Sequence, residues 1–366
     1  MTKRLNVALF IIIFLAKDES AKAQAGMDFE KYDPPSTLVV AEHKLQKAKF
    51  PFIDVHNHQY NMATQDLNEL VRPMNAMNMA VMVNLSGEGG SLLSQITSNI
   101  KAHSPSRFIV FTNLDFNDFG KASWTADAVK RLEEDVKHGA NGLKIFKNLG
   151  FSVKDNLGTR VAVDDKRLDA VWDACGRLGI PVLIHTADPK PFWDPLDANN
   201  ERWLELKTHP GRKRSATDPE PFEVLIEEQH RMFKNHPATT FIAAHFGWYA
   251  NDLQHLSTLL DALPNVIVEF GAVIAELGRQ PKAAKVFFTK YQDRILFGKD
   301  SWAPEEYKTY FRVLETEDEY FPYHKRYHAF WRMYGIGLPD DILKKVYFKN
   351  ALRIIPNIDK SLFAGY

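Results

Sequence analysis

The chain has 366 residues, of which 45% are hydrophobic and 25% are charged, a composition typical of globular proteins. Lysine plus arginine and aspartate plus glutamate both number 46, so no basic excess favours nucleic acid or an anionic membrane surface. The single cysteine, Cys175, excludes an internal disulfide and a thiolate-rich zinc site.

Residues 1–23 have the pattern of a signal peptide. Lys3 and Arg4 precede a short apolar stretch, and an A-x-A cleavage site stands directly before Gln24. The apolar stretch is too short for a comfortable membrane span. We therefore expect an exported protein, periplasmic or secreted, that keeps no stable membrane span after cleavage. Translation from Met27 would instead leave the protein in the cytoplasm.

Residues 24–50 are predicted to form a polar N-terminal arm, and residues 51–366 a single domain. Within that domain, short runs rich in Val, Ile, Leu and Phe alternate with stretches of helical periodicity. Such alternation favours a parallel α/β barrel over a sandwich or a helical bundle. The predicted strands span residues 52–58, 80–85, 107–112, 142–146, 181–185, 240–245, 265–270 and 294–300. Helices are predicted at residues 125–138, 165–178, 221–235, 251–262 and 304–315.

Two long segments extend this pattern. Residues 186–237, after the fifth strand, are too long for one loop and one helix, so we expect a lid or a substrate wall there. The basic Arg212-Lys213-Arg214 within it is predicted to be a solvated surface patch. An aromatic tail from Glu317 ends in a helix that starts near Pro339. The predicted fold is a (β/α)8 TIM barrel with an N-terminal arm, an excursion after strand 5 and a C-terminal helical tail.

Four of the predicted strands end in groups that can bind a metal: His56 and His58, His185, His245 and Asp300. The carboxyl ends of the strands of a parallel barrel converge on one face, where active sites are built. His56 and His58 are two residues apart, so both point to the same face of their strand. With His185 they would form an open zinc site with room for water. Asp300 could bind the same metal and accept a proton from the attacking water, or cap the following helix.

Other polar residues near these strand ends have alternative roles. His245 is predicted to contact the attacking water or the substrate, with binding of a second metal as the alternative. Asp54 either supports a ligand histidine or closes its strand. Lys144 either bridges two metals as a carbamate or pairs with a carboxylate, and Lys147 is a weaker candidate for the bridge. Glu269 could contact the substrate or support Lys144.

These motifs resemble those of the amidohydrolase superfamily. The resemblance covers roughly residue 50 to the end and is strongest to the amidohydrolase-related (amidohydrolase-2) branch, which looks like aminocarboxymuconate-semialdehyde decarboxylase and related carboxy-lyases. The matching segments are Asp54-Val55-His56-Asn57-His58, Gly142-Leu143-Lys144-Ile145, Ile184-His185-Thr186, Ala244-His245-Phe246-Gly247, Phe297-Gly298-Lys299-Asp300 and the terminal helix at 347–353.

The resemblance implies a ligand set for one divalent metal, most often Zn²⁺, with Mn²⁺ as the alternative. His56, His58, His185 and Asp300 would bind it, and His245 would polarise or deprotonate the water. Lys299 departs from the family pattern, because a small residue, often threonine, is usual there.

Three hypotheses follow. The first is a metal-dependent hydrolase that uses an activated water on a small ester, lactone or amide. The second is a metal-dependent carboxy-lyase for an aromatic or muconate-like acid. The third is a non-catalytic exported metal-binding protein, although a structural site would need neither His245 nor Asp300. In each case we expect a small molecule rather than nucleic acid as the partner, and a homo-oligomer is compatible with the sequence.

Overall fold

The computed structural model describes Gly26, residues 28–217 and residues 220–366. The predicted signal peptide and the alternative start at Met27 lie outside these residues. The chain divides into two compact units, one ending at Leu38 and the other spanning Val39–Tyr366. The described part of the first unit contains one short 3₁₀ helix, η1 (Phe29–Lys31).

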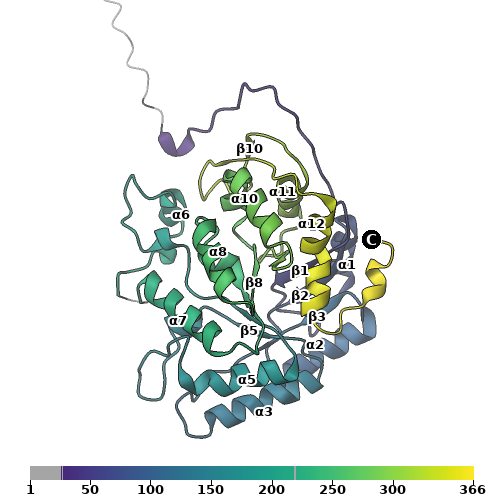
Figure 1. Ribbon diagram of the computed structural model, residues 1–366, viewed down its shortest axis with the longest axis vertical. Coiled ribbons are helices and arrows are strands. Elements are labelled where there is room, and N and C mark those ends of the chain that lie inside the picture. The colour runs from purple at the N-terminus through teal and green to yellow at the C-terminus, as the bar shows by residue number, and fades with distance from the viewer. Residues whose placement is uncertain (1–25, 27, 218–219) are drawn as a thin grey trace, which may run out of the picture. The chain divides into compact units, whose positions relative to one another are not determined.

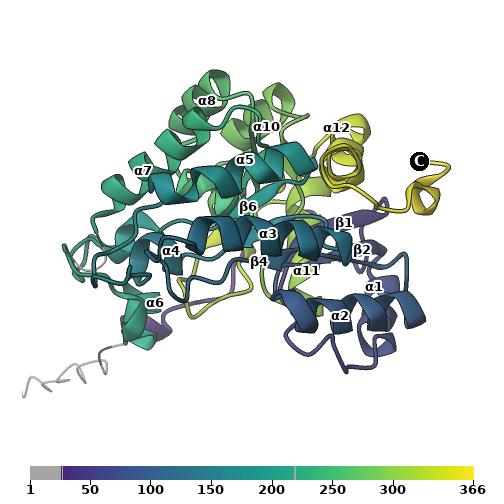
Figure 2. The same ribbon diagram turned by 90° about the horizontal axis from the view of Figure 1, so that it is seen from below.

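The second unit contains two parallel sheets whose strands follow one another in chain order (Figures 1 and 2). Their strands are fully or almost fully buried, as expected of a barrel wall covered by helices. The first sheet contains β1 (Phe52–Asn57), β2 (Met79–Asn84) and β3 (Phe108–Val110). The second contains β4 (Thr112–Asn113), β5 (Leu143–Ile145), β6 (Val182–Ile184), β7 (Phe241–Ala243), β8 (Val266–Glu269) and β9 (Ile295–Leu296).

Backbone hydrogen bonds join the two sheets into one closed barrel. The N–H of Phe111 donates to the carbonyl of Asn84, so β3 and β4 form one strand that is interrupted at Phe111. At the other junction, the N–H of Val55 donates to the carbonyl of Phe297, and a parallel bridge pairs Asn57 with Asp300. The predicted eight-stranded (β/α)8 barrel is therefore confirmed.

Amphipathic helices surround the strands. In α2, for example, Leu93, Ile96 and Ile100 recur at helical spacing and are all buried. None of the helices in the described part of the chain is both long and apolar enough to cross a membrane. The outer helices are α1 (Asn68–Ala76), α2 (Gly90–His103), α3 (Trp124–Lys137), α5 (Asp169–Leu178), α7 (Phe222–Asn235), α8 (Leu253–Ala262), α10 (Pro281–Lys290) and α11 (Pro304–Glu315).

Shorter helical segments occupy the loops and the tail. Where the sequence predicts a helix after Pro339, α12 continues through a π-helical turn into α13. The short elements are η2 (Lys166–Leu168), α4 (Asn148–Phe151), η3 (Lys190–Phe192), α6 (Trp203–Thr208), η4 (Pro210–Arg212), η5 (Ala244–Trp248), α9 (Ile274–Arg279), α12 (Asp340–Lys344), η6 (Lys345–Lys349), α13 (Asn350–Ile354) and η7 (Lys360–Phe363).

A cluster of aromatic rings packs β1 and β9 against the outer helices. The ring centres of Phe52 and Phe297 lie 4.7 Å apart, and Phe311 of α11 and Tyr347 of η6 lie 5.4 and 5.9 Å from Phe52. All four side chains are completely buried. Because aromatic pairs of this kind add to the burial of apolar surface, the two strands are held rigidly where the predicted ligands emerge.

The excursion after β6 is packed against α9 by an ion pair and against the tail by a cation–π contact. The buried guanidinium of Arg202 donates to Glu205, 2.8 Å away, and to Glu276 of α9. The guanidinium carbons of Arg202 and Arg279 lie 5.0 and 4.0 Å from the ring centre of Trp331, beside the small hairpin of β10 (Phe321–Pro322) and β11 (Arg332–Met333). Cation–π contacts and buried charge pairs thus tie this side of the barrel together.

Candidate metal centre

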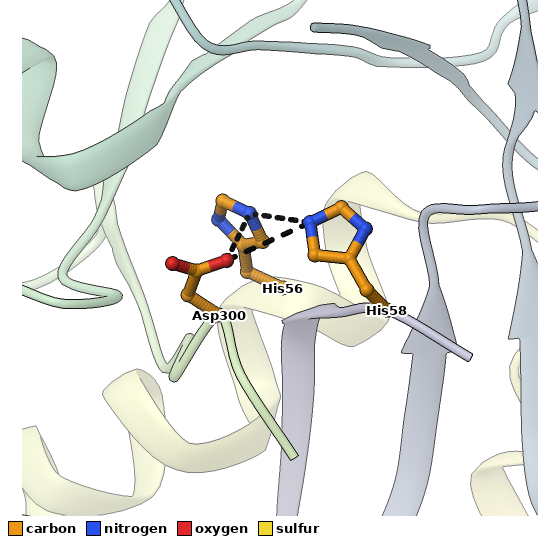
Figure 3. A group of neighbouring side chains, drawn as sticks. All are labelled: His56, His58 and Asp300. Carbon is orange, nitrogen blue, oxygen red and sulfur yellow. Dashed lines mark hydrogen bonds and ion pairs between the residues drawn. The ribbon is translucent and has the colours of Figure 1, made fainter. Parts of the chain in front are cut away.

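Three of the predicted ligands meet at the junction of β1 and β9. Nε2 of His56 lies 3.3 Å from Nε2 of His58, and Oδ1 of Asp300 lies 3.5 and 3.6 Å from these two nitrogens (Figure 3). Around a tetrahedral Zn²⁺ with bonds of about 2.1 Å, ligand atoms are about 3.4 Å apart. The spacing of the three atoms therefore fits one small divalent cation.

The hydrogen bonds on the far side of each ring explain why a cation suits this cluster. Nδ1 of His56 lies 2.8 Å from Glu269 Oε1, to which it donates, and Nδ1 of His58 lies 2.8 Å from Ser86 Oγ. Because the carboxylate of Glu269 only accepts, Nδ1 of His56 carries the proton and its Nε2 carries a lone pair directed at the other ligands. This lone pair and the carboxylate oxygen of Asp300 repel one another, and a cation between them removes that repulsion.

Both imidazoles are held neutral, which metal binding requires. Burial, followed by the nearby charge of Lys144, lowers the pKa of His56 well below its ordinary value. The same two causes lower the pKa of His58 to about 4. The rings can therefore accept a metal near neutral pH without first losing a proton.

Glu269, at the end of β8, accepts hydrogen bonds from His56 and from the backbone on either side of the centre. Its Oε1 also accepts the backbone N–H of His245 at 2.8 Å, and its Oε2 accepts the N–H of Gly271 at 2.6 Å. Glu269 thus orients His56 and the turn that carries His245, whereas the sequence suggested a contact with the substrate or with Lys144. His56, His245 and Glu269 also lie close enough together to form a metal site. The hydrogen bonds of Glu269 to His56 and to the backbone of His245 explain this proximity without a second metal.

His245 lies in a left-handed turn directly after β7. Its φ is 57°, and the φ angles of Phe246, Gly247 and Trp248 are 56°, 58° and 61°. Left-handed backbone costs a non-glycine residue roughly 1–2 kcal/mol, and such strain tends to occur at functional sites. Nδ1 of His245 donates to the carbonyl of Gly271 at 2.7 Å, so the buried Nε2 remains available as an acceptor.

His185 stands beside His245 rather than within the three-ligand cluster. Its Nδ1 lies 3.4 Å from Nε2 of His245, and its own Nε2 is buried without a hydrogen-bond partner among the described residues. Burial, with the neighbouring charges of His245 and Lys144, lowers the pKa of His185 well below its ordinary value. The structure therefore brings together three of the four predicted ligands. The fourth, His185, lies next to His245 with a neutral ring.

Asp54 acts on the backbone of the ligands and not on their rings. Its carboxylate accepts the backbone N–H groups of His56 and Lys299, both at 3.1 Å, and the hydroxyl of Tyr307 at 2.6 Å. Burial raises the pKa of Asp54 to about 6, although these hydrogen bonds oppose the shift. One carboxylate therefore fixes the backbone at His56, a predicted ligand, and at Lys299, directly before Asp300.

The two lysines near β5 have different surroundings. Lys144 is 1% exposed, and its Nζ has no hydrogen-bond partner among the described residues. Burial lowers its pKa to about 8. Nζ of Lys147, in contrast, donates to Asp188 at 2.6 Å, and the same carboxylate binds Arg214 at 2.6 and 2.9 Å. The prediction of a solvated basic patch is therefore wrong for Arg214, whose side chain is only 18% exposed.

Aromatic rings flank the centre on two sides. The ring of Tyr60, which is 70% exposed, lies nearly parallel to that of His58 at 6.1 Å, and Phe146 lies 5.5 Å from His58. On the other side, Trp248 lies 4.5 Å from His245 and 5.7 Å from His185. These rings offer flat apolar surfaces next to the potential metal ligands.

Lys299, the departure from the family pattern, is neutralised by its neighbours. Its buried Nζ donates to Ser301 Oγ at 3.0 Å and to the carboxylate of Glu306 in α11. The positive charge of Lys299, directly before Asp300 in the chain, is thus balanced by a carboxylate of α11. This ion pair contributes to the local polarity around Asp300.

The same ion pair predicts a pH dependence of stability. Burial alone would raise the pKa of Glu306, but its contacts with His324 and Lys299 outweigh burial and lower the pKa from 4.5 to about 2. A lowered carboxyl pKa stabilises the folded state above the unfolded pKa, and this contribution disappears as the pH falls through the folded pKa. The stability advantage of the wild type over Glu306→Gln should therefore shrink between pH 4.5 and 2 in urea unfolding. Glu305→Gln is the matched control, because this exposed carboxylate bonds to Lys308 of the same helix and not to Lys299.

The sequence also matches a known family. Residues 106–356 match the amidohydrolase family model, and the chain belongs to this family. The matched residues do not include His56 and His58. The assignment of these two histidines to the candidate metal centre therefore rests on the geometry. The enzymes of the family are metal-dependent, and the three converging side chains are the candidate metal site of this one. No curated protein matches the chain in sequence.

Solved structures agree with the barrel fold. A TIM-barrel protein from Bordetella bronchiseptica is 16% identical with a TM-score of 0.52, and the similarity covers 83% of this chain and 98% of that one. A 2,6-dihydroxybenzoate decarboxylase from Rhizobium is 15% identical (TM-score 0.51, 83% and 98% covered). A dihydroxybenzoic acid decarboxylase from Polaromonas sp. JS666, with bound manganese and 2-nitroresorcinol, is 14% identical (TM-score 0.51, 86% and 97% covered). At these identities the likeness concerns the fold.

Proposed function

We propose that the protein is a hydrolase that directs an activated water at a small ester, lactone or amide. The observation that carries the proposal is the convergence of His56, His58 and Asp300 beside a buried imidazole, His245, whose Nε2 is an acceptor. A divalent metal at such a centre polarises the substrate carbonyl and lowers the pKa of a water.

The residues of the chain divide the remaining work. His56, His58 and Asp300 would hold the ion. The remaining candidate ligand is His185, whose Nε2 is buried without a partner among the described residues. The Gly271 carbonyl fixes the proton of His245 on Nδ1, so Nε2 can accept the proton of the attacking water and later return it to the leaving group. Asp300 is the alternative acceptor for this proton. A purely structural metal site would leave both the strained turn and the buried base without a role.

We propose a single ion, Zn²⁺ or alternatively Mn²⁺. Two imidazole nitrogens and one carboxylate oxygen suit Zn²⁺, and the spacing of the three atoms fits a single ion. The similarly folded Polaromonas enzyme holds manganese, which keeps Mn²⁺ as the alternative.

The second candidate function is a carboxy-lyase for an aromatic acid. It is favoured by the rings of Tyr60, Phe146 and Trp248 around the centre, which suit a planar substrate. Two similarly folded structures are dihydroxybenzoate decarboxylases, which agrees with this alternative. An exported location, as the N-terminal sequence predicts, is part of either proposal.

Parallel assays of metal-loaded protein distinguish the two reactions. A panel of esters, lactones and amides is followed by product chromatography, and carboxylated aromatics are followed by release of carbon dioxide. Hydrolysis that falls by about 10²–10⁴-fold in His245→Asn, with unchanged metal content, is the expected result. Carbon dioxide release without hydrolysis would replace the first function with the second, and the absence of both activities would contradict both.

A further inference from the structure

Three residues beside the barrel each carry a buried polar atom that has no hydrogen-bond partner in the part of the chain that the structure describes. These atoms are Nε1 of Trp248, Nε of Arg202 and Oε2 of Glu276. Arg202 and Glu276 are 4% and 5% exposed, and they already bind each other through other atoms of their side chains. Buried donors and acceptors of folded proteins are nearly always paired with protein or with ordered water. The ion pair thus leaves one donor and one acceptor to be satisfied, and the indole adds a second donor.

The same three residues line one small cavity, which has a volume of about 20 Å³. A water molecule needs a cavity of about 10–15 Å³ and at least two polar partners. An organic group or a hydrated ion needs far more space. The unpaired atoms therefore belong to residues that share a space of the size of a water molecule.

The chemistry of the three atoms indicates the same occupant. Nε1 of Trp248 and Nε of Arg202 can only donate a hydrogen bond, whereas the carboxylate oxygen of Glu276 can only accept one. Two donors exclude a metal ion or ammonium, and the carboxylate disfavours an anion. A neutral water accepts two hydrogen bonds and donates up to two, so it can satisfy all three atoms at once.

Trp248 connects this cavity to the candidate active site. It ends the left-handed turn that carries His245, and its ring lies 4.5 Å from the ring of His245 and 5.7 Å from that of His185. Backbone strain of this kind persists only where the surroundings fix it. Glu269 fixes the start of the turn by accepting the backbone N–H of His245 at 2.8 Å. A hydrogen bond from the indole of Trp248 would fix its end.

We propose that the cavity binds one water molecule, which accepts hydrogen bonds from Trp248 and Arg202 and donates one to Glu276. Trp248 is then a positioning residue, because the anchored indole packs against His245 and holds that ring in place. The water also ties the turn to the excursion through Arg202 and to α9 through Glu276. The positioning role rests on the proposed function, whereas the water site does not.

A high-resolution crystal structure of the metal-loaded protein tests the water site. It should show one ordered water within about 3.2 Å of Nε1 of Trp248, Nε of Arg202 and Oε2 of Glu276. Val273 also lines the cavity, so Val273→Ile should displace this water, because it adds a methylene group and changes none of the three polar groups. A wild-type cavity without ordered water, or a direct hydrogen bond from the indole to a protein acceptor, would overturn the proposal.

Kinetics of Trp248→Phe test the positioning role. The variant keeps an aromatic ring beside His245 but removes one hydrogen bond, so kcat should fall about two- to tenfold while KM stays unchanged. Trp124→Phe is the matched control, because Nε1 of Trp124 in α3 donates to the carbonyl of Asp115 at 3.2 Å. It loses a hydrogen bond of the same kind and should keep the kcat of the wild type. Equal losses of kcat in both variants, or a change confined to KM, would contradict the role of Trp248.

The double variant Trp248→Phe/Val273→Ile shows whether both changes act through the same water. If they do, its kcat should be no lower than that of the more impaired single variant, whereas independent effects would multiply. The free energy of unfolding in urea, measured on the metal-free proteins, needs no turnover and should show the same lack of additivity. Additive losses of stability would overturn the water site. An ordered water and non-additive stability in a protein without any turnover would support the water site and contradict the proposed function.

Discussion

Replacement of both His56 and His58 by alanine is expected to give a folded barrel that retains no metal and loses about a thousandfold or more in activity. Two of the three converging ligand atoms disappear, and Asp300 with His185, the remaining candidate ligand, is expected to hold a divalent ion too weakly to retain it against water. Metal-ion catalysis contributes several kcal/mol of charge stabilisation, and each 1.36 kcal/mol corresponds to about a factor of ten in rate. Metal content by mass spectrometry and kcat/KM on the same samples measure both effects.

A histidine outside the centre provides the control for this double variant. His103 is exposed on α2, and among the described residues its ring bonds only to the carbonyl of Asn99 in the same helix. His103→Ala should keep the metal and the activity of the wild type. Retention of a full equivalent of metal by the double variant would show that His56 and His58 are not the ligands.

The second large effect is expected for Gly298→Ala, a change of one methyl group. A Cβ at Gly298 would lie 2.1 Å from Oε2 of Glu269 and 3.0 Å from Cβ of His56. Glu269 would have to leave its three N–H donors, and His56 would lose the carboxylate that orients it. Overpacking costs about 1–3 kcal/mol, and loss of the residue that orients a ligand weakens metal binding about 10–100-fold.

Urea unfolding and a metal-binding titration measure the two consequences separately. Gly211→Ala is the matched control, since a Cβ at Gly211 meets nothing within 4 Å and this glycine does not have a positive φ. Its free energy of unfolding should change by no more than about 0.5 kcal/mol. Wild-type metal affinity in Gly298→Ala would contradict the role of Glu269 in orienting His56.

Much of the fold could be predicted from the sequence because the strands of a barrel are buried on both faces. Each of the eight predicted runs corresponds to an observed strand, including β9, of which only Ile295 and Leu296 are regular. The break at Phe111 was not predicted, because it depends on hydrogen bonding between neighbouring strands and not on periodicity. The outer helices α1, α2 and α10 were not among the predicted ranges. Pro73 inside α1 and Gly90 at the start of α2 weaken the helical signal of those two segments.

The site could be predicted only in part. The meeting of His56, His58 and Asp300 follows from the position of each at a strand end, since the ends of parallel strands converge. The bond from His56 to Glu269 depends on how β8, β9 and β1 align when the barrel closes, which a single sequence does not reveal. That Nζ of Lys144 has no acceptor among the described residues is likewise a property of three-dimensional packing.

The most direct test of the metal centre is the metal content of the wild-type protein, purified without chelators and measured by inductively coupled plasma mass spectrometry. The geometry of His56, His58 and Asp300 predicts about one Zn²⁺ or Mn²⁺ per chain. Folded protein that holds no metal and takes up none on titration with either ion would contradict the centre. Two ions per chain would contradict the single-ion site and indicate that Lys144 takes part in metal binding.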